Sequence, residues 1–94
     1  MFFVYILYSE SIDKFYIGQT DSVERRIQDH NDIANPNWTS KGKPWTLKCT
    51  IECSRRLVAL RIEKAIKKKK SRRYIEILIN VPDAVKHMVR AHDC

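Results

Sequence analysis

Two apolar stretches near the start of the sequence decide the fold: Phe2–Ser9, which reads FFVYILYS, and residues 15–18, which read FYIG. Both are rich in aromatic and β-branched side chains, a composition typical of buried strands. Residues 10–14, between them, have turn chemistry. We therefore predict two neighbouring strands joined as a hairpin, the second of which ends at Gly18.

A helix follows the predicted hairpin. Asp21 and Glu24 have the spacing of a capping box, which predicts a helix over residues 22–31. Four side chains share one face of this helix, at spacings i, i+3, i+4 and i+7: Val23, Arg26, Ile27 and His30. We expect the two apolar side chains to lie in the core and the two polar ones at its border.

A polar segment and a third strand come next. Residues 32–44 are polar and contain two prolines, which predicts a surface loop carrying Lys41 and Lys43. Trp45–Cys53 alternates apolar and polar residues with period two, the pattern of a half-buried strand. Its apolar positions are expected on one face of the sheet: Trp45, Leu47, Cys49, Ile51 and Cys53.

The remaining sequence predicts helices. Ser54 is the expected cap of a helix that continues to Lys70, with an inner side made of Val58, Ala59, Leu60, Ile62, Ala65 and Ile66. Glu63 interrupts this apolar band, and a carboxylate near a core is costly unless it is paired or binds a cation. Ser71 and Pro82 are expected to begin two shorter helices.

The composition describes one small domain. The 94 residues have a mass of 11.1 kDa and 44% of them are hydrophobic, enough for a small core. No apolar run approaches the roughly 20 residues of a membrane span, and Met1 is followed directly by Phe2 without the features of a secretory signal. Three cysteines without CxxC spacing favour a reducing cytoplasm over a disulfide scaffold.

The positive charge is concentrated in the second half of the sequence. The formal net charge is +7, divided into −1 for residues 1–53 and +8 for residues 54–94. Seven cations lie within ten residues: Lys64, Lys67, Lys68, Lys69, Lys70, Arg72 and Arg73. Such a field attracts polyanions, most commonly nucleic acid. A solvated helix face kept basic for solubility is the alternative interpretation.

Five side chains have the chemistry that phosphodiester hydrolysis requires: Tyr5, Tyr16, Arg26, His30 and Glu63. A carboxylate holds a hard divalent cation, a guanidinium offsets the charge on the phosphate, and a proton acceptor prepares the attacking water. The sequence contains no phosphate-cradling glycine loop and no HExxH or GxSxG motif. Each residue alone also has an ordinary structural interpretation, as a strand aromatic, a surface pair or a salt-bridge partner.

The order of these residues resembles the GIY-YIG nuclease superfamily. The resemblance is carried by Phe3-Val4-Tyr5, Tyr16-Ile17-Gly18, Arg26 with His30, and Glu63 on a later helix. The small stand-alone members, akin to the N-terminal nuclease domain of an excision-repair protein, are the most similar. The resemblance covers residues 1–79, and residues 80–94 are expected to be a C-terminal helical tail of the same domain. Three positions differ from the family pattern: Phe3 replaces a glycine, Gln19 replaces the lysine of repair-type members, and Asn80 is too late for their asparagine.

The resemblance implies an α+β fold, a small three-stranded antiparallel sheet flanked by helices in β-β-α-β-α-α order. It also implies cleavage of DNA with one divalent metal ion, Mg²⁺ or Mn²⁺. By position, Glu63 would bind the ion, Arg26 would contact the scissile phosphate, and Tyr5 and Tyr16 would line the site. The proton acceptor stays open among Tyr5, Tyr16 and His30, because an ordinary tyrosine pKa near ~10 makes a poor base.

The substrate expectations follow from the short chain. With no length for a recognition domain, we expect structure-directed or loosely specific cutting of single-stranded, flapped or damaged DNA in repair, recombination or processing, with RNA as an alternative substrate. The basic side chains expected to contact nucleic acid are Arg25, Lys41, Lys43, Lys64, Lys67, Lys68, Lys70, Arg72 and Arg73. The alternatives are a non-catalytic nucleic-acid-binding module on the same fold, and an interaction protein that docks through residues 84–94.

Overall fold

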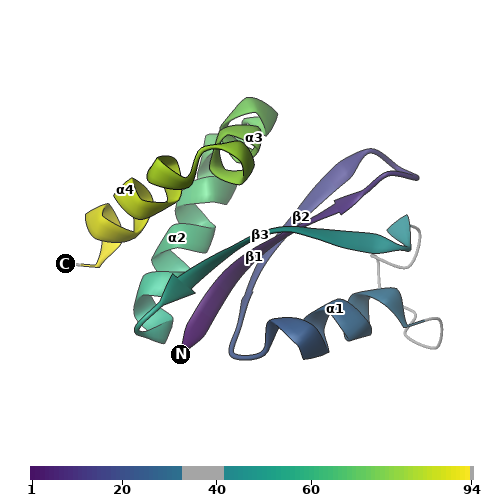
Figure 1. The fold of residues 1–94 in the computed structure, drawn as a ribbon, viewed down its shortest axis with the longest axis horizontal. Helices are drawn as coiled ribbons and strands as arrows, with labels where there is room; N and C mark the ends of the chain where they lie inside the picture. Colours follow the sequence, from purple (N-terminus) through teal and green to yellow (C-terminus); the bar gives the residue numbers. More distant parts are fainter. Residues whose placement is uncertain (33–41, 94) are drawn as a thin grey trace.

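The structure, a computed structural model, describes residues 1–32 and 42–93. Within these residues a three-stranded antiparallel sheet is flanked by four helices (Figure 1). The strands are β1 (Phe2–Ser9), β2 (Lys14–Thr20) and β3 (Trp45–Cys53), and the helices are α1 (Val23–Asn31), α2 (Arg56–Lys69), α3 (Arg72–Asn80) and α4 (Pro82–His92). The predicted α+β class and element order are confirmed. The second strand is longer than predicted and continues two residues beyond Gly18.

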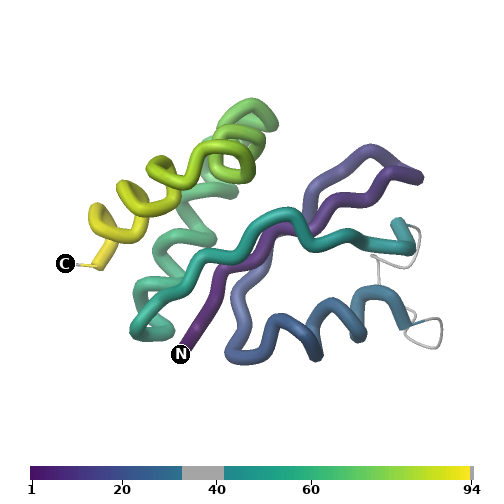
Figure 2. The backbone as a smooth tube through the Cα atoms, in the orientation of Figure 1, coloured from purple at the N-terminus to yellow at the C-terminus, as the bar shows by residue number. Residues whose placement is uncertain are grey.

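The sheet is covered on both faces. Its strand order is β2-β1-β3, so β1 lies in the middle and β2 forms one edge. Helix α1 lies under one face, while α2, α3 and α4 lie together on the other (Figures 1 and 2). Alternate residues of β1 therefore enter two cores: Val4 and Ile6 pack with α2, and Tyr5 and Leu7 pack beneath α1. A strand buried on both faces needs apolar residues at nearly every position, as Phe2–Ser9 has.

A β-bulge divides β3 between the two cores. Ile6 pairs with Cys49, whereas the next residue, Leu7, pairs with Leu47, so Lys48 is the extra residue. One extra residue reverses which side of the sheet the following side chains occupy. Cys49, Ile51 and Cys53 accordingly face α2, and Trp45 packs with Tyr5 and Leu7 beneath α1. The prediction of a single apolar face for this strand is therefore wrong for Trp45 and Leu47.

The helix termini confirm some predicted caps and correct others. The Ser71 side chain accepts a hydrogen bond from the Tyr74 backbone N–H (3.1 Å), and Pro82 occupies the first turn of α4, both as predicted. Helix α1 is capped by Ser22 rather than Asp21, because the Ser22 hydroxyl is the group that reaches a first-turn amide. Helix α2 begins after Arg55 rather than Ser54 and has no side-chain cap. The chain leaves α2 through Lys70, which adopts a left-handed conformation with φ of 48°.

The inner side of α2 is narrower than predicted. Val58, Ala59, Ile62 and Ile66 are buried, but Leu60 is 43% exposed. The expectation that Leu60 faces the core is therefore wrong, since a helix resting on a flat sheet buries only one stripe. Among the described residues, no helix combines the length and apolar character that a membrane crossing requires.

Candidate active site

Two tyrosines meet on the face of the sheet beneath α1. Tyr5 pairs with Gly18 and Leu7 pairs with Tyr16 in the antiparallel register of β1 and β2. Because side chains alternate along a strand, Tyr5 and Tyr16 project from the same face. Their ring centroids lie 6.1 Å apart in a stacked arrangement. Tyr5 is fully buried, whereas Tyr16 is half-buried.

Helix α1 brings an arginine and a histidine to these rings. His30 is buried, with its Nε2 atom 3.2 Å from the Tyr5 hydroxyl and its ring centroid 4.5 Å from that of Tyr16. Arg26, one helical turn earlier, interacts with the Tyr5 hydroxyl and forms an ion pair with Asp29 at 3.7 Å. Its side chain remains 40% exposed. The four predicted residues on this side of the sheet therefore form one cluster, with Arg26 nearest the solvent.

The electrostatics of this tyrosine–arginine–histidine cluster favour neutral rings beside a permanent cation. Burial raises the pKa of Tyr5, and the hydrogen bond to Arg26 opposes this only in part. Burial, followed by the positive charge of Arg26, lowers the pKa of His30. His30 is therefore a neutral imidazole with an acceptor nitrogen at neutral pH, while Tyr5 keeps its proton. Between these two residues, His30 is the better proton acceptor.

Gly18 is required by the position of Tyr5. A Cβ atom at residue 18 would lie 2.4 Å from the Tyr5 hydroxyl oxygen and 2.6 Å from Cζ. No described glycine has a positive φ, so the reason for glycine here is close approach and not backbone freedom. The glycine at the end of the second tripeptide thus makes room for the hydroxyl of the first.

Glu63 lies on α2, which covers the opposite face of the sheet. Its side chain is 18% exposed and accepts a hydrogen bond from the Lys67 ammonium at 3.1 Å. Within residues 1–32 and 42–93, no hydrogen bond or ion pair joins Glu63 to the tyrosine–arginine–histidine cluster. The structure therefore brings four of the five predicted catalytic residues together, whereas the described contact of the fifth, Glu63, is with Lys67.

The donor chemistry at Glu63 is compatible with a weakly held hard cation. The described residues contain no group of three or more His, Cys, Asp or Glu side chains able to hold a metal. Mg²⁺ keeps several waters and commonly takes only one or two carboxylates together with substrate phosphates, so a single carboxylate fits it. The Lys67 ammonium contacts only Oε2 of Glu63, so the other carboxylate oxygen is the one available to a cation.

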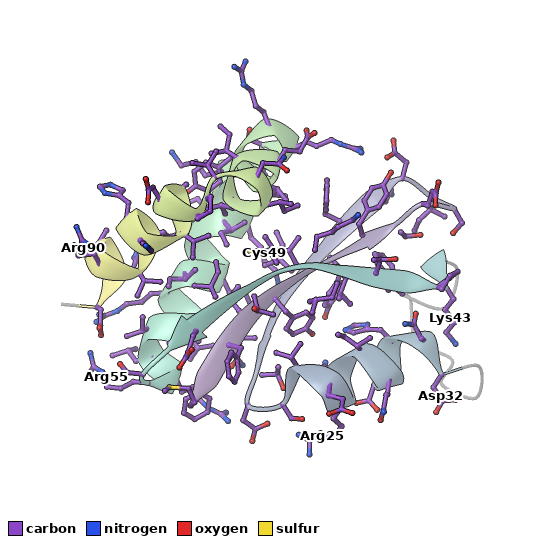
Figure 3. The ribbon with its side chains drawn as sticks, in the orientation of Figure 1. Arg25, Asp32, Lys43, Cys49, Arg55 and Arg90 are labelled. Atoms are coloured by element: carbon purple, nitrogen blue, oxygen red, sulfur yellow. The ribbon has the colours of Figure 1, made fainter. Side chains whose placement is uncertain are left out.

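The predicted nucleic-acid contacts occupy three regions. Lys64, Lys67 and Lys68 line a cleft with Glu63, and Lys70 and Arg72 line a second cleft that also includes Lys67; Arg73 is exposed on α3. Arg25 lies at the start of α1, points away from the sheet and pairs with Asp21 at 3.2 Å (Figure 3). Lys43 donates to the Asp32 carbonyl at the other end of α1. Lys41 lies outside the described residues.

Sequence reasoning missed a cluster at the tip of the hairpin. The Tyr8 hydroxyl donates to the Asp13 carboxylate at 2.5 Å, and Arg72 donates both to that carboxylate (2.5 Å) and to the Asp13 carbonyl (3.2 Å). Asp13 has a positive φ of 52°, a turn conformation that Asp tolerates. Asp13 and Arg72 are 59 residues apart, so no local pattern identifies this contact.

Fold and site together define a small α+β domain whose sheet carries a tyrosine–arginine–histidine cluster on one face and a helical carboxylate on the other. A family model described as the GIY-YIG catalytic domain matches residues 1–75. No curated protein and no solved structure matches the chain. The protein belongs to the GIY-YIG family, whose domains are typically nucleases acting on DNA, generally with a divalent metal.

Proposed function

We propose that the protein is a metal-dependent endonuclease that hydrolyses phosphodiester bonds in DNA, with Mg²⁺ or Mn²⁺ as its ion. The observation that carries the proposal is the convergence of Tyr5, Tyr16, Arg26 and His30 on one face of the sheet. This set supplies a cation for the phosphate and neutral proton-transfer groups. A buried histidine held against two tyrosines, with a partly exposed guanidinium beside them, is the kind of perturbed titratable cluster that is common at functional sites.

The edge strand β2 offers a route between the two parts of the site. Tyr16 projects from β2 beneath α1, while Ile17 of the same strand packs in the core with Ile62 and Ile66 of α2. No further strand of the described residues covers β2, so a nucleic-acid strand lying across this edge can reach both faces. On this proposal the scissile phosphate lies near Arg26 and extends toward Glu63.

Each residue then has a distinct role. Arg26 donates hydrogen bonds to the phosphate and offsets the charge that develops on it. Tyr16, the more exposed of the two tyrosines, orients the attacking water, and neutral His30 accepts the proton with Tyr5 holding the imidazole in place. A divalent ion bound at Glu63 would supply further charge stabilisation and lower the pKa of a bound water.

We propose a loosely specific substrate that is single-stranded, flapped or damaged DNA, contacted through the basic side chains of α2 and α3. The odd number of cysteines and the lack of CxxC spacing support a reducing, cytoplasmic setting. Repair, recombination or DNA processing is the corresponding cellular role.

A binding module without catalysis is the second candidate function. Glu63 is already paired with Lys67, and Gln19 stands where repair-type relatives have a lysine. Gln19 also has a buried side-chain oxygen with no hydrogen-bond partner among the described residues. A module of this kind binds nucleic acid with strong salt dependence, but binding responds neither to metal nor to Glu63.

The test is a cleavage assay on labelled single-stranded, double-stranded and flapped DNA with Mg²⁺, Mn²⁺ or EDTA. Glu63→Gln is expected to lower the cleavage rate by roughly a hundredfold or more. The matched control is Glu52→Gln, which neutralises an exposed carboxylate on β3 and should leave the rate unchanged. Equal rates for the wild type and Glu63→Gln would overturn the proposed metal role. No cleavage by the wild type, with DNA binding retained, would favour the binding module.

A further inference from the structure

The surface around α2 and α3 contains a row of clefts that share lining residues. The first includes Glu63 and Lys67, and the second, of about 470 Å³, includes Lys67, Lys14, Phe15 and Arg72. A third cleft of about 310 Å³ shares Phe15 and Arg72 with the second and reaches Tyr8. The first and second clefts share Lys67, and the second and third share Phe15 and Arg72, so the three are neighbours between Glu63 and the tip of the hairpin. We call the second and third clefts the hairpin groove.

The hairpin groove has a cationic rim and an apolar floor. Four cations border its larger part, namely Lys14, Lys67, Lys70 and Arg72, while the floor contains Phe15, Ile17 and Ile75. The second cleft contains one carboxylate, Asp13, whose charge is paired with Arg72, and the third contains another, Glu76. Cations above an apolar floor suit a ligand that is anionic along one side and flat and apolar along the other, which is the chemistry of an unpaired nucleic-acid strand.

Aromatic rings mark the far end of the groove. The rings of Tyr8 and Phe15 lie 5.0 Å apart at an angle of 48°, and both are half-buried. Arg72 lies 5.2 Å from the Phe15 ring centroid, and the Lys48 ammonium lies 5.9 Å from that of Tyr8. Rings next to cations bind bases by stacking and phosphates by charge, without a need for a particular sequence.

The hydrogen bonds at the hairpin tip hold this surface in place. Arg72 of α3 and Tyr8 of β1 both bond to Asp13, which ties the turn between the strands to the helix. The groove is therefore assembled before a ligand arrives, so binding does not require ordering of the two walls. In a duplex the bases are already stacked within the helix, so a double-stranded ligand has no exposed base face to pack against the apolar floor.

We propose that the hairpin groove binds a single-stranded segment of nucleic acid that continues from the phosphate near Glu63. The direction of the strand rests on the proposed function, whereas occupancy of the groove does not. The inference gives roles to Lys14, Phe15 and Tyr8, and it selects a substrate with an unpaired strand next to the point of cleavage.

Binding is measured without metal, so that it is separate from cleavage. Fluorescence anisotropy follows a labelled oligothymidylate of about 12 nucleotides in EDTA, with a duplex of equal length as the comparison. Each phosphate contact with a single strand contributes about 0.7 to the slope of log affinity against log salt concentration. At 0.1 M salt, this contribution corresponds to about a fivefold change in affinity. Lys14→Gln is therefore expected to weaken binding about fivefold. The matched control, Lys86→Gln on α4, removes the same charge from an exposed site outside the groove and should have no effect.

A second variant tests the apolar floor. Phe15→Leu is expected to weaken binding of the single strand about tenfold, with circular dichroism to verify folding. Equal affinities for Lys14→Gln and Lys86→Gln, or tighter binding of the duplex than of the single strand, would overturn the hairpin groove. The two proposals can be refuted separately. If the protein binds the single strand but never cleaves it, only the proposed nuclease activity is refuted. If it cleaves DNA but Lys14→Gln binds the single strand as tightly as the wild type, only the proposed role of the groove is refuted.

Discussion

Replacing Gly18 by alanine is expected to displace Tyr5 and destabilise the protein. The new Cβ atom would lie 2.4 Å from the Tyr5 hydroxyl and 2.6 Å from Cζ, whereas carbon atoms in contact normally lie about 3.5–4.0 Å apart. The ring must therefore move by about 1 Å. It has little room to do so, because Tyr5 is fully buried between His30 and Tyr16.

The expected cost is that of an overpacked core, about 1–3 kcal/mol. For a chain of 94 residues, this corresponds to a decrease in Tm of roughly 5–20 °C in thermal unfolding followed by circular dichroism. The cause is tested in a Tyr5→Phe background, which lacks the hydroxyl that approaches most closely. Gly18→Ala should cost less there, since the two substitutions affect one contact. A Tm equal to that of the wild type, or the same loss in both backgrounds, would refute this explanation of the glycine.

Three further predictions concern stability. The pKa of His30 is lower in the folded chain than its ordinary value of about 6.5, so the unfolded chain binds the proton more readily. The free energy of unfolding, measured with urea, should therefore fall as the pH decreases below about 6.5. The variant His30→Gln should show a weaker pH dependence. Ser71→Ala should lower the free energy of unfolding by about 1 kcal/mol, because it removes the cap of α3. Ser54→Ala removes no cap and should change it by less than about 0.5 kcal/mol. Equal effects of the two substitutions would contradict the observed start of α2. Ile62→Ala should lower the free energy of unfolding by about 2–5 kcal/mol, and Leu60→Ala by less than about 1 kcal/mol, because only Ile62 is buried. Similar losses for the two variants in chemical denaturation would show that both side chains face the core.

The elements of the fold follow from local patterns in the sequence. The bounds of β3 are those that alternation predicts, Trp45–Cys53, and the cap at Ser71 is found where a short polar side chain precedes a helical pattern. These features depend on neighbours within a few residues. The caps wrongly predicted at Asp21 and Ser54 also concern neighbouring residues. Several polar residues next to a helix terminus can cap it, and the sequence does not show which of them does so.

The faces of the elements are less predictable. Alternation predicts Trp45 and Leu47 beside Cys49, but the bulge opposite Ile6 and Leu7 sends them to the other side of the sheet. Alternation specifies that neighbouring residues face opposite ways, and it does not specify where pairing with another strand slips by one residue. Burial of Trp45 is therefore predictable, and the core that it joins is not.

The sequence by itself determined the family and the set of residues that form the candidate site, because the spacings that identify Tyr5, Tyr16, Arg26 and His30 are read along the chain. Only the tertiary structure decided how these residues meet. The register of β1 and β2 places the Tyr5 hydroxyl against Gly18, and the packing of α1 brings His30 to it. Helix α2, which carries Glu63, packs against the other face, and Glu63 pairs there with Lys67. The physical reason is the distance along the chain between the residues that interact. Helix caps, hydrophobic periodicity and motif spacings involve residues that are close in sequence. Strand register and the pairing of Asp13 with Arg72 depend instead on residues that come together only when the chain is folded.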